Sequence, residues 1–175
     1  MNKDTKEYFT KHFTEDWSNF HLTGYSLLSK LPTEGEETIL DVGCGFNPLK
    51  RWFDHRLHGI DPCNVLADEM VSIEDFKSDD KYDIVLSLGS INFGSKQDIF
   101  MQTQKAVSFL KPGGRMYWRQ NPGIYDHKPS EFTNVDLFKW TFKINIEIAE
   151  ALAMEVVDLR WDNARIYSEW QCTGS

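Results

Sequence analysis

The stretch that most constrains the fold is residues 39–45, a short apolar run that ends in Gly-Cys-Gly. The apolar part is typical of a buried strand, and the two glycines let a ligand approach the backbone closely. A second strand-like run, residues 57–60, is followed by Asp61, which lies twenty positions after Asp41. In open α/β sheets a carboxylate at this place accepts a ribose hydroxyl. The spacing therefore indicates a site for an adenosine-containing cofactor.

The residues around the glycines distinguish between cofactors. A dinucleotide site carries a third glycine where the next helix begins and meets the pyrophosphate. Here that place holds the bulky residues 46–48, Phe-Asn-Pro. Asp41, two positions before the first glycine, would repel a pyrophosphate but suits a cation. A sulfonium with an amino-acid tail fits these residues, and a nicotinamide-dependent oxidoreductase is disfavoured.

At this loop the chain resembles the class I S-adenosylmethionine (SAM)-dependent methyltransferases, whose first motif is an acidic residue followed by Gly-x-Gly. Residues 82–88, Tyr-Asp-Ile-Val-Leu-Ser-Leu, resemble the fourth strand of that family, and residues 110–115, Leu-Lys-Pro-Gly-Gly-Arg, resemble its turn into the fifth strand. These landmarks span about residues 38–119 in the order of the family. The resemblance implies SAM as the cofactor and methyl transfer as the reaction.

Together with the periodicity, the resemblance predicts an α/β fold, a three-layer Rossmann-like sandwich. Its mostly parallel seven-stranded sheet would have the order 3-2-1-4-5-7-6 and end in a C-terminal antiparallel hairpin. The expected strands are 38–42, 56–60, 70–73, 82–88, 115–119, 155–161 and 165–172, and the expected helices lie at 48–54, at 95–110 and within 134–153. Little room remains between Asp61 and the third strand, so we expect the second crossover helix to be shortened or lost.

The length of 175 residues predicts one domain, residues 1–175. Its Rossmann-like core would be residues 38–175, preceded by an N-terminal helical segment, residues 1–37. In that segment aromatic and leucine side chains recur at helical intervals, which suggests one or two amphipathic helices that pack on the sheet. Tyr8 and Trp17 would either cover the cofactor, as similar aromatics do in the family, or pack in the core.

The formal net charge of −8, with scattered lysines and arginines, disfavours a nucleic-acid substrate. No apolar run is long enough to span a bilayer, the N-terminus is too polar for a signal peptide, and the three cysteines show no paired spacing. We therefore expect a cytoplasmic protein without a disulfide framework, without a membrane and without a metal site, since its histidines show no metal-ligand spacing. The oligomeric state stays open.

The resemblance assigns most of the candidate residues to the cofactor. Asp41 would lie near the ammonium end, directly or through water, or would orient the loop, and Asp61 would accept both ribose hydroxyls. For adenine, either Ser72 replaces the usual carboxylate or Glu74 takes its place, unless Glu74 is part of a solvated turn. The predicted cofactor-binding residues are Asp41, Gly43, Gly45, Asp61, Pro62, Ser72, Ile73, Glu74, Ser87, Leu88 and Gly89.

Two candidates for catalysis follow strands four and five. Asn92 would hold a hydroxyl or amine of the acceptor by hydrogen bonds but is no base near neutral pH, or else it caps a helix or turn. His127, beside Asp126, is either a base or a surface histidine. Asn92, Asn121 and Tyr125 are the candidate acceptor-binding residues.

The sequence therefore predicts a SAM-dependent methyltransferase that acts on a small molecule or an exposed polar group and whose catalysis depends on positioning. The identity of the acceptor stays open. The alternative is a SAM-fold binding or scaffold protein that has lost catalysis and acts through a partner.

Overall fold

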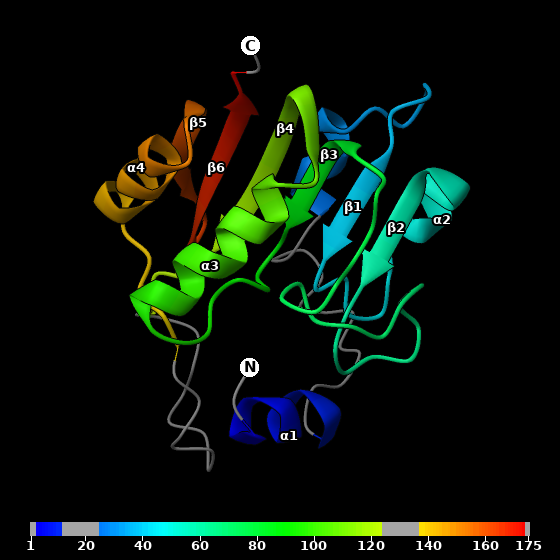
Figure 1. Cartoon of the computed structure of the whole chain (residues 1–175), viewed down its shortest axis with the longest axis horizontal. Coiled ribbons are helices and arrows are strands. Elements are labelled where there is room, and N and C mark those ends of the chain that lie inside the picture. Colours follow the sequence, from blue (N-terminus) through cyan, green and yellow to red (C-terminus); the bar gives the residue numbers. More distant parts are fainter. Residues whose placement is uncertain (1–2, 12–24, 124–136, 174–175) are drawn as a thin grey trace.

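A six-stranded mixed sheet forms the centre of the structure, a computed structural model that describes residues 3–11, 25–123 and 137–173. The parallel strands are β1 (Ile39–Val42), β2 (Leu57–Ile60), β3 (Tyr82–Ser87) and β4 (Leu110–Gln120), and the antiparallel pair is β5 (Met154–Asp162) and β6 (Arg165–Cys172). Their order is β2-β1-β3-β4-β6-β5 (Figure 1). The predicted α/β class, the strand order and the C-terminal hairpin are confirmed.

One predicted strand is wrong. Residues 70–73 form no strand, and the chain beside β2 makes only an isolated parallel bridge between Ile60 and Glu69. The reason is local, because the Asp68 side chain accepts a hydrogen bond from Gly59 N (2.8 Å) and so occupies the edge of β2. Ser72 then begins a turn, since its carbonyl accepts from Asp75 N and Phe76 N. The sheet therefore has six strands in place of seven, and residues 61–81 contain no helix.

Helices cover both faces of the sheet and complete three layers. On one face lie α3 (Lys96–Val107) and α4 (Phe142–Ala151), and on the other lie the 3-10 helix η2 (Tyr25–Lys30) and α2 (Lys50–Phe53), followed by η3 (Asp54–Arg56). The helix expected at 95–110 ends at Val107, because the chain joins β4 at Leu110, where it pairs with Tyr82. The Lys-Pro-Gly-Gly stretch thus lies inside β4 rather than before it.

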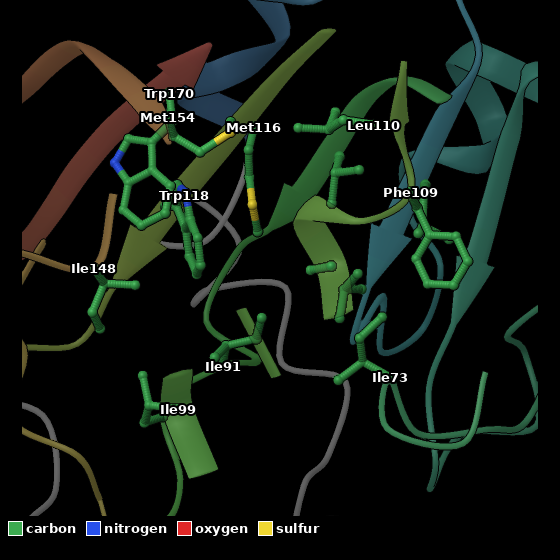
Figure 2. Packing of buried hydrophobic residues seen from close by; sticks show 14 of the residues in the cluster. Ile73, Ile91, Ile99, Phe109, Leu110, Met116, Trp118, Ile148, Met154 and Trp170 are labelled. Atoms are coloured by element: carbon green, nitrogen blue, oxygen red, sulfur yellow. The ribbon is translucent and has the colours of Figure 1, made fainter. Parts of the chain in front are cut away.

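The two faces bury separate apolar clusters. The larger cluster lies under α3 and α4, and Figure 2 shows Trp118 and Trp170 beside Met116 and Met154 within it. The smaller cluster lies under η2 and α2 and uses the alternate residues of the same strands, such as Leu86 and Tyr117. This alternation follows from the two-residue period of a strand with both faces covered.

The sequence suggested that helices of the N-terminal segment pack on the sheet. The helix α1 (Lys3–Lys11) does not lie on either face of it. Figure 1 shows it beyond the carboxyl ends of β1 and β2. It contacts the rest of the chain through Phe9, whose ring meets Phe93 edge to face at 5.2 Å between centroids. None of the described helices is both long and apolar enough to cross a membrane.

Candidate cofactor and acceptor site

A cavity of about 260 Å³ opens at the carboxyl ends of the parallel strands, where open α/β sheets bind their ligands. The loops after β1, β2, β3 and β4 form its walls, and α1 contributes Tyr8 and Phe9. Its described lining residues are Tyr8, Phe9, Gly43, Gly45, Asp61, Pro62, Cys63, Asn64, Leu88, Gly89, Ser90, Asn92, Phe93, Arg119, Asn121, Leu137 and Arg165.

The loop after β1 is shaped by its two glycines. Gly43 has φ +70° and Gly45 has φ +55°, a left-handed backbone that glycine adopts without strain. A Cβ at Gly43 would also lie 2.1 Å from the Cβ of Ser90, so no other residue fits there without movement of the chain. The Gly43 and Cys44 amides both donate to the Ile60 carbonyl, which ties this loop to the end of β2.

Asp61 joins the two loops that the sequence predicted would meet. Its Oδ2 accepts from Gly45 N at 3.1 Å, and its Oδ1 accepts from Cys63 N at 2.8 Å and from Asn64 N at 3.0 Å. These backbone bonds hold the carboxylate in one orientation at the cavity wall. Each oxygen has two lone-pair directions, so Oδ2 retains capacity for a hydroxyl donor.

Asp41 lies below the cavity rather than on its wall. It is 3% exposed in the centre of the sheet, and burial, with the nearby Asp61 charge in second place, raises its pKa to about 7. A cation at the cavity end of β1 would favour the ionised carboxylate. The side chain would thus favour a positively charged ligand group in the cavity above it.

The chain after β3 is held against the glycine loop. The Ser87 and Ser90 hydroxyls lie 3.1 Å apart, and Ser90 Oγ donates to the Val42 carbonyl. Ser87 is buried behind the wall, while Leu88 and Gly89 line the cavity beside Gly43 and Gly45. The predicted residues of β1, β2 and β3 therefore come together in one place.

Asn92 and Asn121 connect the loops after β3 and β4. Asn92 Oδ1 accepts from Asn121 N at 3.1 Å, and both residues line the cavity and are buried. The helix-cap alternative for Asn92 is wrong, because Ser95 is the N-cap of α3 and accepts from Asp98 N. The side-chain oxygen of Asn92 thus holds the two loops together. That its side-chain NH₂ binds the methyl acceptor stays a prediction. Tyr125, His127 and Trp17 lie outside the described residues.

The three residues predicted for the adenine lie away from the described lining. Ile73 is 6% exposed in the larger apolar cluster, the Ser72 hydroxyl pairs with Asp75 Oδ2, and Glu74 accepts from Gln102 Nε2 at 2.9 Å. The missing third strand explains this placement, since the family's adenine residues follow that strand. Pro62, which was also predicted to bind the cofactor, does line the cavity next to Asp61, together with Cys63 and Asn64.

Two arginines at the cavity were missed. Arg119 is the second-last residue of β4 and Arg165 the first of β6, and both line the cavity. Arg119 could have been found from the sequence, because it is a charged residue that follows Tyr117 and Trp118 close to the end of an apolar strand. The sequence carried no comparable signal for Arg165, which follows a turn.

Comparisons with known proteins agree with this architecture. No protein-family profile matches the sequence, and no curated protein matches it, but many solved structures do. The N-methyltransferase NodS from Bradyrhizobium japonicum, solved with S-adenosylhomocysteine, is 12% identical with a TM-score of 0.68, and the match covers 96% of both chains. The chain has the class I SAM-dependent methyltransferase fold.

Other solved structures extend the comparison to further reactions of this fold. The Burkholderia thailandensis 1,6-didemethyltoxoflavin-N1-methyltransferase is 12% identical with a TM-score of 0.67, over 97% of this chain and 88% of that chain. Magnesium protoporphyrin IX methyltransferase from Synechocystis PCC 6803, solved with SAM, is 13% identical with a TM-score of 0.67. The match covers 98% of this chain and 97% of that chain. The methyltransferase fold thus spans nearly the whole chain.

Proposed function

We propose that this protein is a SAM-dependent methyltransferase that acts on a small molecule. One observation carries the proposal: the two-glycine loop and the Asp61 carboxylate meet at a cavity, in a fold whose solved members bind SAM or S-adenosylhomocysteine at comparable chain length. Asp41 and Asp61 lie in β1 and directly after β2, and their carboxylates suit a ligand that carries a sulfonium and an ammonium group.

The residues of the chain would divide the work of binding. The left-handed backbone at Gly43 and Gly45 gives the cofactor access to the loop, and Asp61, held by three amides, presents its carboxylate to the ribose. Leu88 and Gly89 would flank the methionine part. When bound, SAM supplies a methyl group on a sulfonium sulfur, and that sulfur keeps the electron pair of the broken bond when an acceptor lone pair takes the methyl carbon.

Catalysis would depend on alignment and on the exclusion of water. Asn92 is held by the Asn121 amide and is no base near neutral pH, so its part would be to position the acceptor. Tyr8 and Phe9 of α1 line the cavity, and their aromatic rings would help to keep water out. The acceptor proton would pass to solvent after transfer.

Calorimetric titration with SAM and with S-adenosylhomocysteine tests the proposal. We expect micromolar binding by the wild-type protein and a Kd at least ten-fold higher for Asp61→Ala, because the variant loses a charged hydrogen-bond acceptor that contributes about 1.5–3 kcal/mol. Asp79→Ala is the matched control, since Asp79 is exposed and outside the cavity. A folded wild-type protein that binds neither compound would contradict the proposal.

The second candidate, a scaffold protein with the same fold but no catalysis, predicts the same binding. It is favoured by the lack of a histidine, a lysine or a carboxylate other than Asp61 among the described residues that line the cavity. Conversion of SAM to S-adenosylhomocysteine in the presence of any acceptor would exclude it.

A further inference from the structure

Arg119 and Arg165 bring positive charge to one wall of the cavity. Arg119 is 2% exposed, and its Nε lies 3.1 Å from Asp162 Oδ2. Its other two nitrogens, Nη1 and Nη2, are buried and have no hydrogen-bond partner in the described part of the chain. A buried guanidinium with two unpaired NH₂ groups is costly, so these nitrogens call for a ligand that accepts hydrogen bonds.

Arg165 lies on the same face of the sheet as Arg119. Arg119 is paired with Tyr167 across β4 and β6, and side chains two positions apart along a strand share a face. Burial and then the Arg119 charge lower the pKa of Arg165, while burial lowers the pKa of Arg119 against the opposing effect of Asp162. Two cations thus share one wall of the cavity, and Asp162 is paired with Arg119 beside them.

This cationic wall is separated from the predicted cofactor residues by the sheet order. Asp61 follows β2, whereas Arg119 belongs to β4, three strands away in the order β2-β1-β3-β4. At roughly 4.8 Å between neighbouring strands this separation is about 14 Å. A cofactor that occupies the ends of β2, β1 and β3 would leave the arginines facing the remaining ligand.

We propose that the methyl acceptor is a small molecule with a carboxylate or phosphate group, which Arg119 and Arg165 bind. Guanidinium groups pair with both anions through two parallel hydrogen bonds, which fixes the orientation of the bound molecule. Phe93 and Leu137, paired by a backbone bridge, line the same cavity and offer an apolar surface to the rest of the acceptor. This inference rests on the proposed function and specifies its substrate class.

The test compares matched charged and neutral compounds. Dissociation constants of benzoate against benzamide, and of phenyl phosphate against phenol, are measured by ligand-observed NMR with protein saturated by S-adenosylhomocysteine. We expect the anion of at least one pair to bind ten-fold or more tightly than its neutral counterpart, and the pair that discriminates identifies carboxylate or phosphate. Equal binding within both pairs overturns the inference.

Three variants connect the preference to the arginines. Arg119→Gln and Arg165→Gln should each remove most of the ten-fold preference. Arg51→Gln should keep it, because Arg51 is exposed on α2. If Arg119→Gln does not fold, Arg165→Gln alone carries the test. A preference that survives Arg165→Gln contradicts the proposed pair.

Binding of S-adenosylhomocysteine is measured first, so that the two proposals fail separately. If the wild type binds it but shows no anion preference, the acceptor class is wrong and the proposed function stands. If both arginine variants lose S-adenosylhomocysteine affinity instead, the arginines hold the cofactor and the inference is overturned. If the wild type does not bind it, the proposed function fails, and an arginine-dependent anion preference in the ligand-free protein still supports the anion site.

Discussion

Asp41 lies in the middle of β1 with its carboxylate buried near Asp61, and its pKa is raised to about 7. In the unfolded chain the pKa would return to about 3.8. Between these values the folded protein binds more protons at Asp41 than the unfolded chain does. The contribution of Asp41 to the free energy of unfolding therefore falls as the pH rises from about 4 to about 7.

Replacement of Asp41 by Asn should change this slope. We expect the free energy of unfolding of Asp41→Asn, relative to wild type, to increase between pH 4 and pH 7 by an amount on the order of a few kcal/mol and then to level off. Urea denaturation at a series of pH values measures it. The readout is how the difference in free energy of unfolding changes with pH, because the Asn amide alters the buried hydrogen bonds by the same amount at every pH. If the two proteins show parallel curves of free energy against pH, the raised pKa of Asp41 is contradicted.

At the scale of the element, α4 is tied to the sheet by one buried polar residue. Asn145 Nδ2 donates to Gln120 Oε1 (2.6 Å) and to Ser168 Oγ (3.1 Å), and Asn145 Oδ1 accepts from Trp170 Nε1 (2.8 Å). These three contacts join α4 to β4 and β6 in a region with no access to water, since Asn145 has 0% exposure. They fix the helix position more narrowly than apolar packing alone would.

Truncation of this residue should destabilise the protein strongly. Asn145→Ala leaves Trp170 Nε1 and Gln120 Oε1 without their partner, and each buried unsatisfied group costs about 1–3 kcal/mol. We expect a loss of roughly 2–5 kcal/mol in the free energy of unfolding, measured by urea denaturation. Glu150→Ala, at an exposed position of the same helix, should stay within about 0.5 kcal/mol of wild type. A similar small effect in both variants would contradict the role of the network.

At the scale of the whole molecule, the two apolar clusters share strands. In β3 and β4 the residues Val85 and Trp118 belong to the cluster under α3 and α4, while Leu86 and Tyr117 belong to the cluster under η2 and α2. Because alternate residues of one strand serve both faces, neither face can lose its packing while the other keeps it.

The protein should therefore unfold as one unit, as expected for a single domain. We predict that tryptophan fluorescence and far-ultraviolet circular dichroism report the same urea midpoint. Trp118, Trp140 and Trp170 all lie in the larger cluster, so fluorescence follows mainly that face, whereas circular dichroism follows all helices and strands. Two separate midpoints would show that the faces, or the N-terminal segment, unfold independently.

The sequence by itself determined most of the strands and the end of the sheet that holds the site. Apolar runs before Gly43 and Asp61 and the hairpin of β5 and β6 were legible because strand periodicity and turn residues are local properties. A helix was expected within 134–153, and α4 lies in that range with Ile148 and Ala149 buried. The role of Asn145 inside the same helix was not visible, since its partners come from β4 and β6.

Only the tertiary structure decided the third strand and the cationic wall. Residues 70–73 have strand-like composition, but the Asp68 side chain occupies the edge of β2 that they would need. Arg119 and Arg165 are 46 positions apart in the sequence and share a face only because β6 pairs with β4 in one register. Local patterns indicate which segments can become strands. Whether such a segment pairs, and which distant charges meet, depends on the order and register of the strands, which no local pattern encodes.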